Sequence, residues 1–221
     1  MDDASRRWCL VLPVKRLAVA KTRLGPPYDG ARRALALAFA VDTAAAALDC
    51  PLVAAVQVVT DEPEAADALR ALGCDVSGDD PDAGLNPALT HGASVAARRH
   101  PGTSVGTLAA DLPALRAAEL AVALRRAAAH GRSFVRDAEG SGTTLLLARA
   151  SDDLRPMFGA GSAARHAGSG AFEVAADALP SLRRDVDTAA DLDAVTLLGA
   201  GSRTRQVLAS LGGAGSSSRA G

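Results

Sequence analysis

Two lysines, Lys15 and Lys21, lie six residues apart, and all the remaining basic residues in this 221-residue chain are arginines. A lysine ammonium is a compact charge, and the planar fork of arginine does not replace it against a phosphate. Together with Arg23, the lysines follow the apolar segment Trp8–Val14. The pattern predicts a loop that binds a polyphosphate; the alternative is a basic loop exposed to solvent.

A carboxylate follows a second apolar segment. Asp111 comes directly after Thr107–Ala110 and shortly before Pro113. In open α/β sheets, ligands bind outside the carboxyl ends of the strands, and Mg²⁺ favours a few carboxylates together with substrate phosphates. The position therefore predicts a metal ligand. The alternative is that Asp111 only caps a helix that begins near Leu115.

Asp185 and Asp187 are two residues apart, so on a strand their side chains face the same way. Two like-facing carboxylates repel each other unless a cation or a ligand lies between them. The alternative is that Asp187 or Thr188 caps the following helix, with Asp191 completing a capping arrangement. Both can hold at once, and Asp187 is then the residue with two roles.

A glycine-rich turn, Gly159–Ser162, precedes a short helix. Such a turn exposes backbone N–H groups at the positive end of the helix dipole, which is an anion site, and Ser162 adds a hydroxyl. The alternative is a turn without function. Arg165 and His166 lie one turn further on, where a histidine is more often a surface or packing residue.

Gly84–Pro87 suggests a helix start, with Asn86 as the N-cap and Pro87 as the first helical residue. The Asn86 amide could instead contact a base or a ribose in a cleft. The acidic residues just before this segment do not decide between the two interpretations.

Composition limits the classes of function. The net charge of −1 argues against broad binding to nucleic acid or to an anionic membrane, so an anion site must be local. The three cysteines lack metal-ligand spacing. The charged first residues are not followed by the apolar h-region of a signal peptide, and no apolar run is long enough to span a membrane, so we expect a cytoplasmic protein.

Short apolar segments alternate with amphipathic, alanine-rich ones, which is typical of α/β architecture. The expected strands are Trp8–Val14, Leu52–Thr60, Cys74–Ser77, Thr103–Ala110, Ser133–Arg136, Thr143–Arg149 and Leu182–Val186. The expected helices are Asp29–Leu48, Asp61–Gly73, Pro87–His100, Pro113–His130, Ser162–His166 and Thr188–Leu198. The two strands within 133–149 follow each other without a helix between them, which breaks the alternation of strands and helices and suggests a mixed sheet. We expect a flexible arm over 1–7, one domain over 8–211, and a disordered Gly/Ser tail over 212–221.

The motifs occur together in a recognisable order. They are Leu12-Pro13-Val14-Lys15 with Lys21-Thr22-Arg23-Leu24, Val59-Thr60-Asp61, Gly84-Leu85-Asn86, Ala110-Asp111-Leu112-Pro113, Gly142-Thr143-Thr144, Phe158-Gly159-Ala160-Gly161-Ser162-Ala163-Ala164-Arg165-His166 and Asp185-Val186-Asp187-Thr188. From Trp8 to Gly199 the chain resembles the guanylyltransferases of deazaflavin coenzyme F-420 biosynthesis, whose fold is like that of the molybdenum-cofactor guanylyltransferases. No Gly-x-Gly-x-x-Gly fingerprint follows the first strand, which argues against a hydride-transfer dehydrogenase.

The resemblance implies a single-domain, Rossmann-like α/β nucleotidyltransferase fold with a central mixed, mostly parallel sheet flanked by helices. It also implies transfer of GMP from GTP to a small phosphorylated three-carbon acid. Phosphoenolpyruvate is the expected acceptor and 2-phospho-L-lactate the alternative. Mg²⁺ is the expected metal, with Mn²⁺ as a substitute, and neither nucleic acid nor a membrane is an expected partner.

The resemblance also assigns roles to residues. The expected catalytic residues are Lys15, Lys21 and Asp111; the nucleotide-binding residues are Pro13, Lys15, Lys21, Arg23, Thr60 and Asn86; the acceptor-binding residues are Thr144, Gly159 and Ser162; the metal ligands are Asp111, Asp185 and Asp187. A downstream transferase that accepts the unstable product is a further conceivable partner, and the sequence leaves the oligomeric state open. Two alternatives remain: another nucleotidyltransferase of the same fold, and a catalytically silent nucleotide-binding module.

Overall fold

The computed structural model describes residues 7–17, 21–80 and 82–216, and its centre is a seven-stranded sheet in the order β3-β2-β1-β4-β6-β5-β7. β6 runs antiparallel to both of its neighbours, whereas the other neighbouring pairs are parallel. The strands are β1 (Trp8–Pro13), β2 (Val53–Val59), β3 (Asp75–Ser77), β4 (Ser104–Leu108), β5 (Arg132–Arg136), β6 (Thr143–Ala148) and β7 (Phe172–Glu173). The mixed, mostly parallel sheet predicted from the sequence is confirmed.

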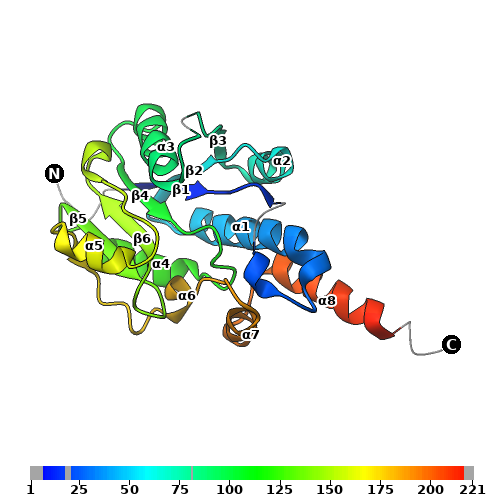
Figure 1. The fold of residues 1–221 in the computed structure, drawn as a ribbon. Helices are drawn as coiled ribbons and strands as arrows, with labels where there is room; N and C mark the ends of the chain where they lie inside the picture. Colours follow the sequence, from blue (N-terminus) through cyan, green and yellow to red (C-terminus); the bar gives the residue numbers. More distant parts are fainter. Residues whose placement is uncertain (1–6, 18–20, 81, 217–221) are drawn as a thin grey trace.

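Helices cover both faces of the sheet, with α3 on one side and α1 on the other (Figure 1). The α-helices are α1 (Arg32–Leu48), α2 (Pro63–Leu72), α3 (Leu85–Arg99), α4 (Ala117–Ala127), α5 (Ser162–Gly168), α6 (Pro180–Arg183), α7 (Ala189–Leu198) and α8 (Ser202–Ser216). None of the helices in the described part of the chain combines the length and the apolar character that crossing a bilayer requires.

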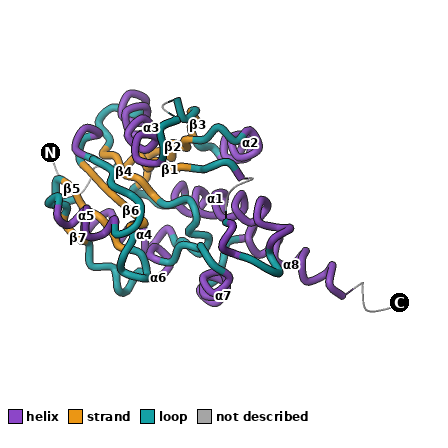
Figure 2. Tube along the Cα trace, viewed as in Figure 1, coloured by secondary structure: helices purple, strands orange, loops and turns teal. Residues whose placement is uncertain are grey.

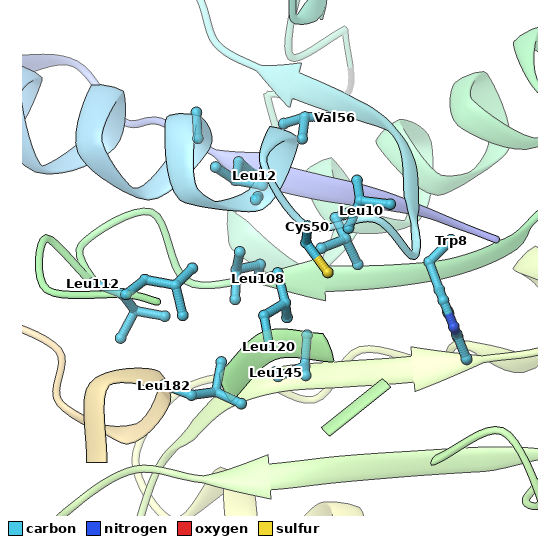
Figure 3. Close-up of a cluster of buried hydrophobic side chains, with 14 of the residues drawn as sticks. Trp8, Leu10, Leu12, Cys50, Val56, Leu108, Leu112, Leu120, Leu145 and Leu182 are labelled. Carbon is cyan, nitrogen blue, oxygen red and sulfur yellow. The ribbon is translucent and has the colours of Figure 1, made fainter. Parts of the chain in front are cut away.

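The alternation of side chains along β1 divides the core in two. Leu10 and Leu12 pack on the α1 side, in a cluster that includes Leu108 and Leu120 (Figure 3). Val11 belongs to the cluster on the α3 side. Because successive residues of a strand point to opposite faces, a parallel strand covered on both sides must be apolar throughout, as Trp8–Leu12 is.

Gly92 brings α3 unusually close to the sheet. A Cβ atom at this position would lie 2.5 Å from Cγ2 of Val59 and 2.6 Å from Cγ1 of Val11, so only glycine fits. The close approach sets the first turns of α3 beside the carboxyl ends of β1 and β2, where Leu85 and Leu89 line the functional cavity described below.

The last helix, α8, was not predicted. The buried Asp42 carboxylate on α1 accepts hydrogen bonds from the backbone N–H groups of Arg203 (3.0 Å) and Thr204 (2.8 Å), which have no partner within the helix. Gly201 allows this approach, because a Cβ atom there would lie 2.2 Å from Cγ of Asp42. α8 continues to Ser216, into the segment 212–221 for which the sequence predicts a disordered tail; 217–221 lie outside the described residues, as do 1–6 of the predicted arm.

The prediction of a strand over Leu182–Val186 is wrong. Pro180 begins the short helix α6, as suits a residue with a fixed φ and no N–H, and the chain then continues as a loop, which Figure 2 shows between α6 and α7. The Arg183 guanidinium donates to the carbonyl oxygen of Asp137 at 2.9 Å, which joins this segment to the turn after β5 instead of to a strand.

Three predicted helix starts differ from the structure. The N-cap of α1 is Ala31 because a 3₁₀ turn begins at Asp29; that of α3 is Gly84, not Asn86; and that of α4 is Arg116, so Asp111 caps no helix. In each case the residue that the local pattern selects as the cap already takes part in a preceding turn or in a tertiary hydrogen bond.

Candidate active site

One cavity of about 660 Å³ opens at the carboxyl ends of β1 and β4. We call one side of it the charged wall, formed by Lys15, Lys21, Arg23, Asp111, Asp185 and Asp187. We call the other side the hydroxyl wall, formed by Thr143, Gly159, Gly161 and Ser162. The cavity lies where ligands bind in open α/β sheets, as the positions of the lysines and of Asp111 predict.

Described residues on either side of Lys21 are held in place by buried contacts. The backbone N–H of Leu17 donates to a carboxylate oxygen of the buried Glu62 at 3.0 Å, and Arg33 pairs with the same carboxylate. Leu17 and Leu24 are both buried. Lys21 itself has a left-handed backbone (φ 57°), which turns the chain so that its side chain enters the cavity.

Lys21 is enclosed by carboxylates. Its ammonium group pairs with Asp111 and, at 3.2 Å, with Asp187, and its side chain is only 12% exposed. Burial acts to lower the pKa of Lys21, but the two carboxylates outweigh burial and the net shift is upward. Lys21 is therefore a fixed cation, and the alternative of a solvent-exposed basic loop does not hold for it. Lys15 and Arg23 line the same wall and are exposed.

The three predicted metal ligands lie on this wall. The backbone N–H of Val186 donates to the carbonyl oxygen of Asp111 at 3.1 Å, which brings the loop after β4 against the segment that contains Asp185 and Asp187. Burial, and then the charges of Asp111 and Asp187, raise the pKa of Asp185 to about 7. Burial is the larger cause of this shift, and a cation bound beside the three carboxylates would oppose both causes.

These carboxylates do not form a complete metal site on their own. Within the described residues, no three His, Cys, Asp or Glu side chains are grouped closely enough to hold a metal ion. Oxygen ligands from one or two carboxylates are nevertheless what Mg²⁺ takes when substrate phosphates supply the rest. The donor set therefore fits a hard divalent cation that binds together with a nucleotide.

The helix-cap alternative for this segment is confirmed for Thr188, and the prediction that Asp187 combines both roles is wrong as far as the cap is concerned. Thr188 caps α7: its hydroxyl accepts from the N–H of Asp191 at 3.3 Å, and the Asp191 carboxylate accepts from the N–H of Thr188 at 2.9 Å. Because Thr188 is the cap, Asp187 keeps its carboxylate for Lys21.

The glycine-rich turn differs from the prediction. Gly159 and Gly161 have left-handed φ values of 120° and 71°, as a tight turn before α5 requires. However, the N–H of Ser162 donates to the carbonyl oxygen of Gly159 (3.0 Å), and that of Ala163 donates to Ser141 (3.1 Å). These two N–H groups are not available to an anion, whereas the hydroxyl groups of Thr143 and Ser162 add donors to this wall.

Thr143, not Thr144, lines the cavity. Adjacent residues of β6 point to opposite faces of the sheet, so only one of the two can do so. The Thr143 hydroxyl lies 3.2 Å from the Ser162 hydroxyl. The Thr144 hydroxyl is buried and has no hydrogen-bond partner in the described part of the chain. The sequence pattern, Gly-Thr-Thr, could not distinguish the two threonines.

His166 is fully buried, so a surface position is excluded. One of its ring nitrogens lies 3.0 Å from the Thr143 hydroxyl, and the other accepts from the N–H of Met157 at 3.1 Å. Burial, followed by the charges of Arg132 and Arg165, lowers the pKa of His166 to about 4. The imidazole is therefore neutral at physiological pH.

Two predicted nucleotide ligands do not line the cavity, although Pro13 does. The Thr60 hydroxyl accepts from the N–H of Glu62 at 3.1 Å, just before α2. The Asn86 amide holds both backbone groups of Phe158: its oxygen accepts from the N–H (2.7 Å) and its nitrogen donates to the carbonyl (3.2 Å). Asn86 thus fixes the turn that leads to Gly159.

The turn between β5 and β6 also borders the cavity, and sequence reasoning assigned it no role in the site. The Asp137 carboxylate accepts from the N–H groups of Ser141 (3.0 Å) and Gly142 (2.7 Å) and closes the turn on itself. All three residues line the cavity. An Asp four residues before a Ser-Gly pair is a signal for such a turn, since Asp side chains bond to nearby backbone N–H groups.

With this geometry established, comparison with known proteins identifies the family. The family model described as "Guanylyl transferase CofC like" matches residues 8–220. The chain belongs to this family. The family resemblance inferred from the sequence motifs is therefore confirmed.

Similar proteins align with most of this chain. A phosphoenolpyruvate guanylyltransferase from Thermomonospora curvata is 56% identical and aligns over 94% of this chain and 91% of its own. A phosphoenolpyruvate guanylyltransferase from Streptomyces coelicolor is 53% identical and aligns over 93% of this chain and 97% of its own. A solved nucleotidyl transferase from Methanothermobacter has a TM-score of 0.55 at 20% identity, covering 87% of this chain and 97% of its own. The last similarity supports the fold alone.

Proposed function

We propose that the protein transfers GMP from GTP to phosphoenolpyruvate, giving enolpyruvyl-diphospho-guanosine and pyrophosphate, as a cytoplasmic step of coenzyme F-420 biosynthesis. The observation that carries the proposal is a single cavity with a charged wall facing a hydroxyl wall, in a chain more than half identical to relatives named for this activity. The charged wall suits a triphosphate, and the hydroxyl wall suits a smaller anion. A downstream transferase would take up the product.

The reaction requires no base. A phosphate oxygen of phosphoenolpyruvate forms a bond to the α-phosphorus of GTP, and the bond from that phosphorus to the α–β bridging oxygen breaks. The bridging oxygen leaves with its electron pair as part of pyrophosphate. Because the attacking oxygen is already anionic, no proton has to be removed. His166 fits this scheme, since both of its nitrogens are engaged and its pKa of about 4 keeps it neutral.

Catalysis then depends on alignment and on neutralisation of charge at the α-phosphorus and the departing pyrophosphate. Lys15, Lys21 and Arg23 would contact the triphosphate oxygens. Lys21 already lies on the wall between two carboxylates, so its charge is in place before the nucleotide binds.

Asp111, Asp185 and Asp187 would hold Mg²⁺ or Mn²⁺, which would act as a Lewis acid on the α-phosphate and as a template for the two substrates. A fold neighbour from Mycobacterium tuberculosis was solved as a complex with manganese, but at 22% identity that similarity concerns the fold alone. Metal dependence of this chain is therefore part of the proposal and needs its own test.

The acceptor is expected to lie against Thr143, Gly159 and Ser162. We place Thr143 here instead of Thr144 because it is Thr143 that lines the cavity. Neutral hydroxyl donors suit a carboxylate or a phosphate group. Phosphoenolpyruvate and 2-phospho-L-lactate share both groups, so these contacts alone do not distinguish them; the names of the similar proteins favour phosphoenolpyruvate.

A matrix assay tests the proposal. Purified protein is incubated with each of four nucleoside triphosphates and each of phosphoenolpyruvate, 2-phospho-L-lactate and 3-phosphoglycerate, and pyrophosphate release is measured. We expect the highest rate with GTP and phosphoenolpyruvate. Pyrophosphate release with CTP in place of GTP, or only with an acceptor other than phosphoenolpyruvate, would indicate a different nucleotidyltransferase. Nucleotide binding without pyrophosphate release in any pairing would indicate a catalytically silent binding module.

A further inference from the structure

A continuous chain of hydrogen bonds runs from the backbone at Met157 to the hydroxyl wall of the cavity. The Met157 N–H donates to Nε2 of His166 at 3.1 Å, and Nδ1 of His166 lies 3.0 Å from the Thr143 hydroxyl. The Ser162 hydroxyl lies 3.2 Å further along. His166, Ser162 and Thr143 are all buried, so directional bonds and not exchange with water determine where the protons lie.

The Met157 N–H determines the tautomer of His166. A backbone N–H can only donate, so Nε2 must be the unprotonated, accepting nitrogen. The ring proton of the neutral imidazole is then on Nδ1, where it donates to the Thr143 oxygen. The other tautomer would set two N–H groups against each other at Met157.

The proton on Nδ1 determines how many donors the wall offers. Thr143 and Ser162 carry two O–H groups between them, and one of these is used in the bond that joins them. Since Thr143 accepts from His166, it need not donate to the ring, and the second O–H is left free. Both hydroxyls belong to residues that line the cavity, so the free O–H is available to a bound anion.

The surroundings prevent the imidazole from turning. Asn86 fixes both backbone groups of Phe158, and the Arg165 guanidinium donates to the carbonyl oxygen of Met157 at 3.0 Å. The Phe158 ring meets the imidazole edge-on, with centroids 5.2 Å apart. The N–H of Met157 is thereby held toward Nε2.

We propose that His166 is a positioning residue: it donates to Thr143 and so leaves one hydroxyl of the Thr143–Ser162 pair free to donate to an anionic group of the acceptor. This assignment rests on the proposed function for the identity of the acceptor. It does not make His166 a catalytic residue, because the ring does not touch a substrate.

Two amide variants separate this role from simple packing. In His166→Asn, the side-chain amide lies near the place of Nδ1 and can still donate to Thr143. In His166→Gln, the amide lies near the place of Nε2 and can accept from Met157 but cannot supply Thr143. Both variants lose the ring, so both should lose a similar amount of thermal stability, and that loss serves as the internal control.

Steady-state kinetics should then distinguish the variants. We expect His166→Gln to raise KM for phosphoenolpyruvate about tenfold, the effect of one lost hydrogen bond to a charged group, and His166→Asn to remain within about threefold of the wild type. KM for GTP should not change in either. His100→Asn, at a partly buried histidine that pairs with Asp75 and does not line the cavity, is the matched control and should have the kinetic constants of the wild type.

Nitrogen-15 NMR of histidine-labelled protein reads the tautomer directly. The wild type should contain one imidazole, absent from the His166→Asn spectrum, that is protonated on Nδ1 and unprotonated on Nε2 at neutral pH. An Nε2-protonated ring, or equal KM values for phosphoenolpyruvate in the Asn and Gln variants, would overturn the assignment. A wild type that does not turn over phosphoenolpyruvate would contradict the proposed function instead, and the NMR result would still decide the tautomer.

Discussion

The two walls of the cavity are held in place by different physical means. On the charged wall, Lys21 pairs with Asp111 and Asp187 across loops, with Asp187 about half exposed. On the hydroxyl wall, Thr143 and Ser162 are buried and neutral, and each bond there has a fixed direction. Ion pairs tolerate rearrangement because Coulomb attraction depends weakly on angle, whereas a hydroxyl network tolerates little.

This difference suggests a division of labour. The charged wall can exchange its internal ion pairs for contacts with a triphosphate and a metal ion, so it should govern the chemical step. The hydroxyl wall is buried and held by directional hydrogen bonds that leave little room for rearrangement, so it should govern affinity for the acceptor. Substitutions on the two walls should therefore change different kinetic constants.

The largest expected effect is on the charged wall. Asp111→Asn keeps the shape of the side chain but removes a charge from the proposed metal site, so we expect kcat to fall about a hundredfold or more. Circular dichroism and thermal unfolding should show an intact fold. Asp67→Asn, on the exposed surface of α2, is the control. Full activity of Asp111→Asn, or wild-type activity in excess EDTA, would refute the metal assignment.

Lys21→Arg should have the next largest effect. The enclosed space between Asp111 and Asp187 accommodates an ammonium group, and a planar guanidinium is larger and directs its donors differently. We expect kcat/KM for GTP to fall roughly tenfold or more, since a misplaced cation stabilises the transition state less well. Arg70→Lys on α2 makes the reverse exchange away from the site. Kinetics indistinguishable from the wild type would mean that the shape of this cation is unimportant.

Ser162→Ala tests the other wall. The variant removes one of the two hydroxyls, so we expect KM for phosphoenolpyruvate to rise about five- to tenfold while the affinity for GTP, measured by calorimetry, stays the same. Gly159→Val should act in the same direction and more strongly, because a β-branched residue is strained at φ 120°. Loss of GTP binding with normal dependence on the acceptor would show that the walls are assigned the wrong way round.

The smallest effect is on stability. His166 has a pKa of about 4 in the folded protein, lowered by burial, against an ordinary value of 6.5. Between these values the unfolded chain binds more protons, so stability falls as the pH drops below 6.5. From pH 7 to pH 5.5 the loss from this group should be about 1 kcal/mol.

Urea unfolding at both pH values measures this loss. Other groups also titrate in the range, so the informative quantity is the difference between the wild type and His166→Phe, in which the dependence on pH should be flatter. Identical dependence in the two proteins would mean that the ring is not buried in its neutral form.

Local patterns predicted the charged wall better than the hydroxyl wall. Lys21 and Asp111 follow apolar strands, and the carboxyl ends of parallel strands meet at one edge of a sheet, so their neighbourhood follows from topology. The choice between Thr143 and Thr144 depends on the register of β6 against β4 and β5, which is a tertiary property. The role of Asn86 likewise depends on a partner 72 residues away.

Helix α8 was missed for a similar reason. Its sequence ends in glycine and serine, which are poor helix formers, and local propensity therefore argues against it. The helix is supported by Asp42, 161 and 162 residues away from the two N–H groups that it binds, and by the packing of Leu208 against a buried cluster. Tertiary contacts outweigh propensity here, and a single sequence does not reveal them.

The most direct test of guanylyl transfer follows the oxygen atoms of the acceptor phosphate. Phosphoenolpyruvate carrying ¹⁸O in its three non-bridging phosphate oxygens is reacted with GTP, and the products are analysed by mass spectrometry. If the acceptor phosphate attacks the α-phosphorus, all three labelled atoms should appear in enolpyruvyl-diphospho-guanosine and none in pyrophosphate. Labelled pyrophosphate, or release of GMP or GDP in its place, would contradict guanylyl transfer.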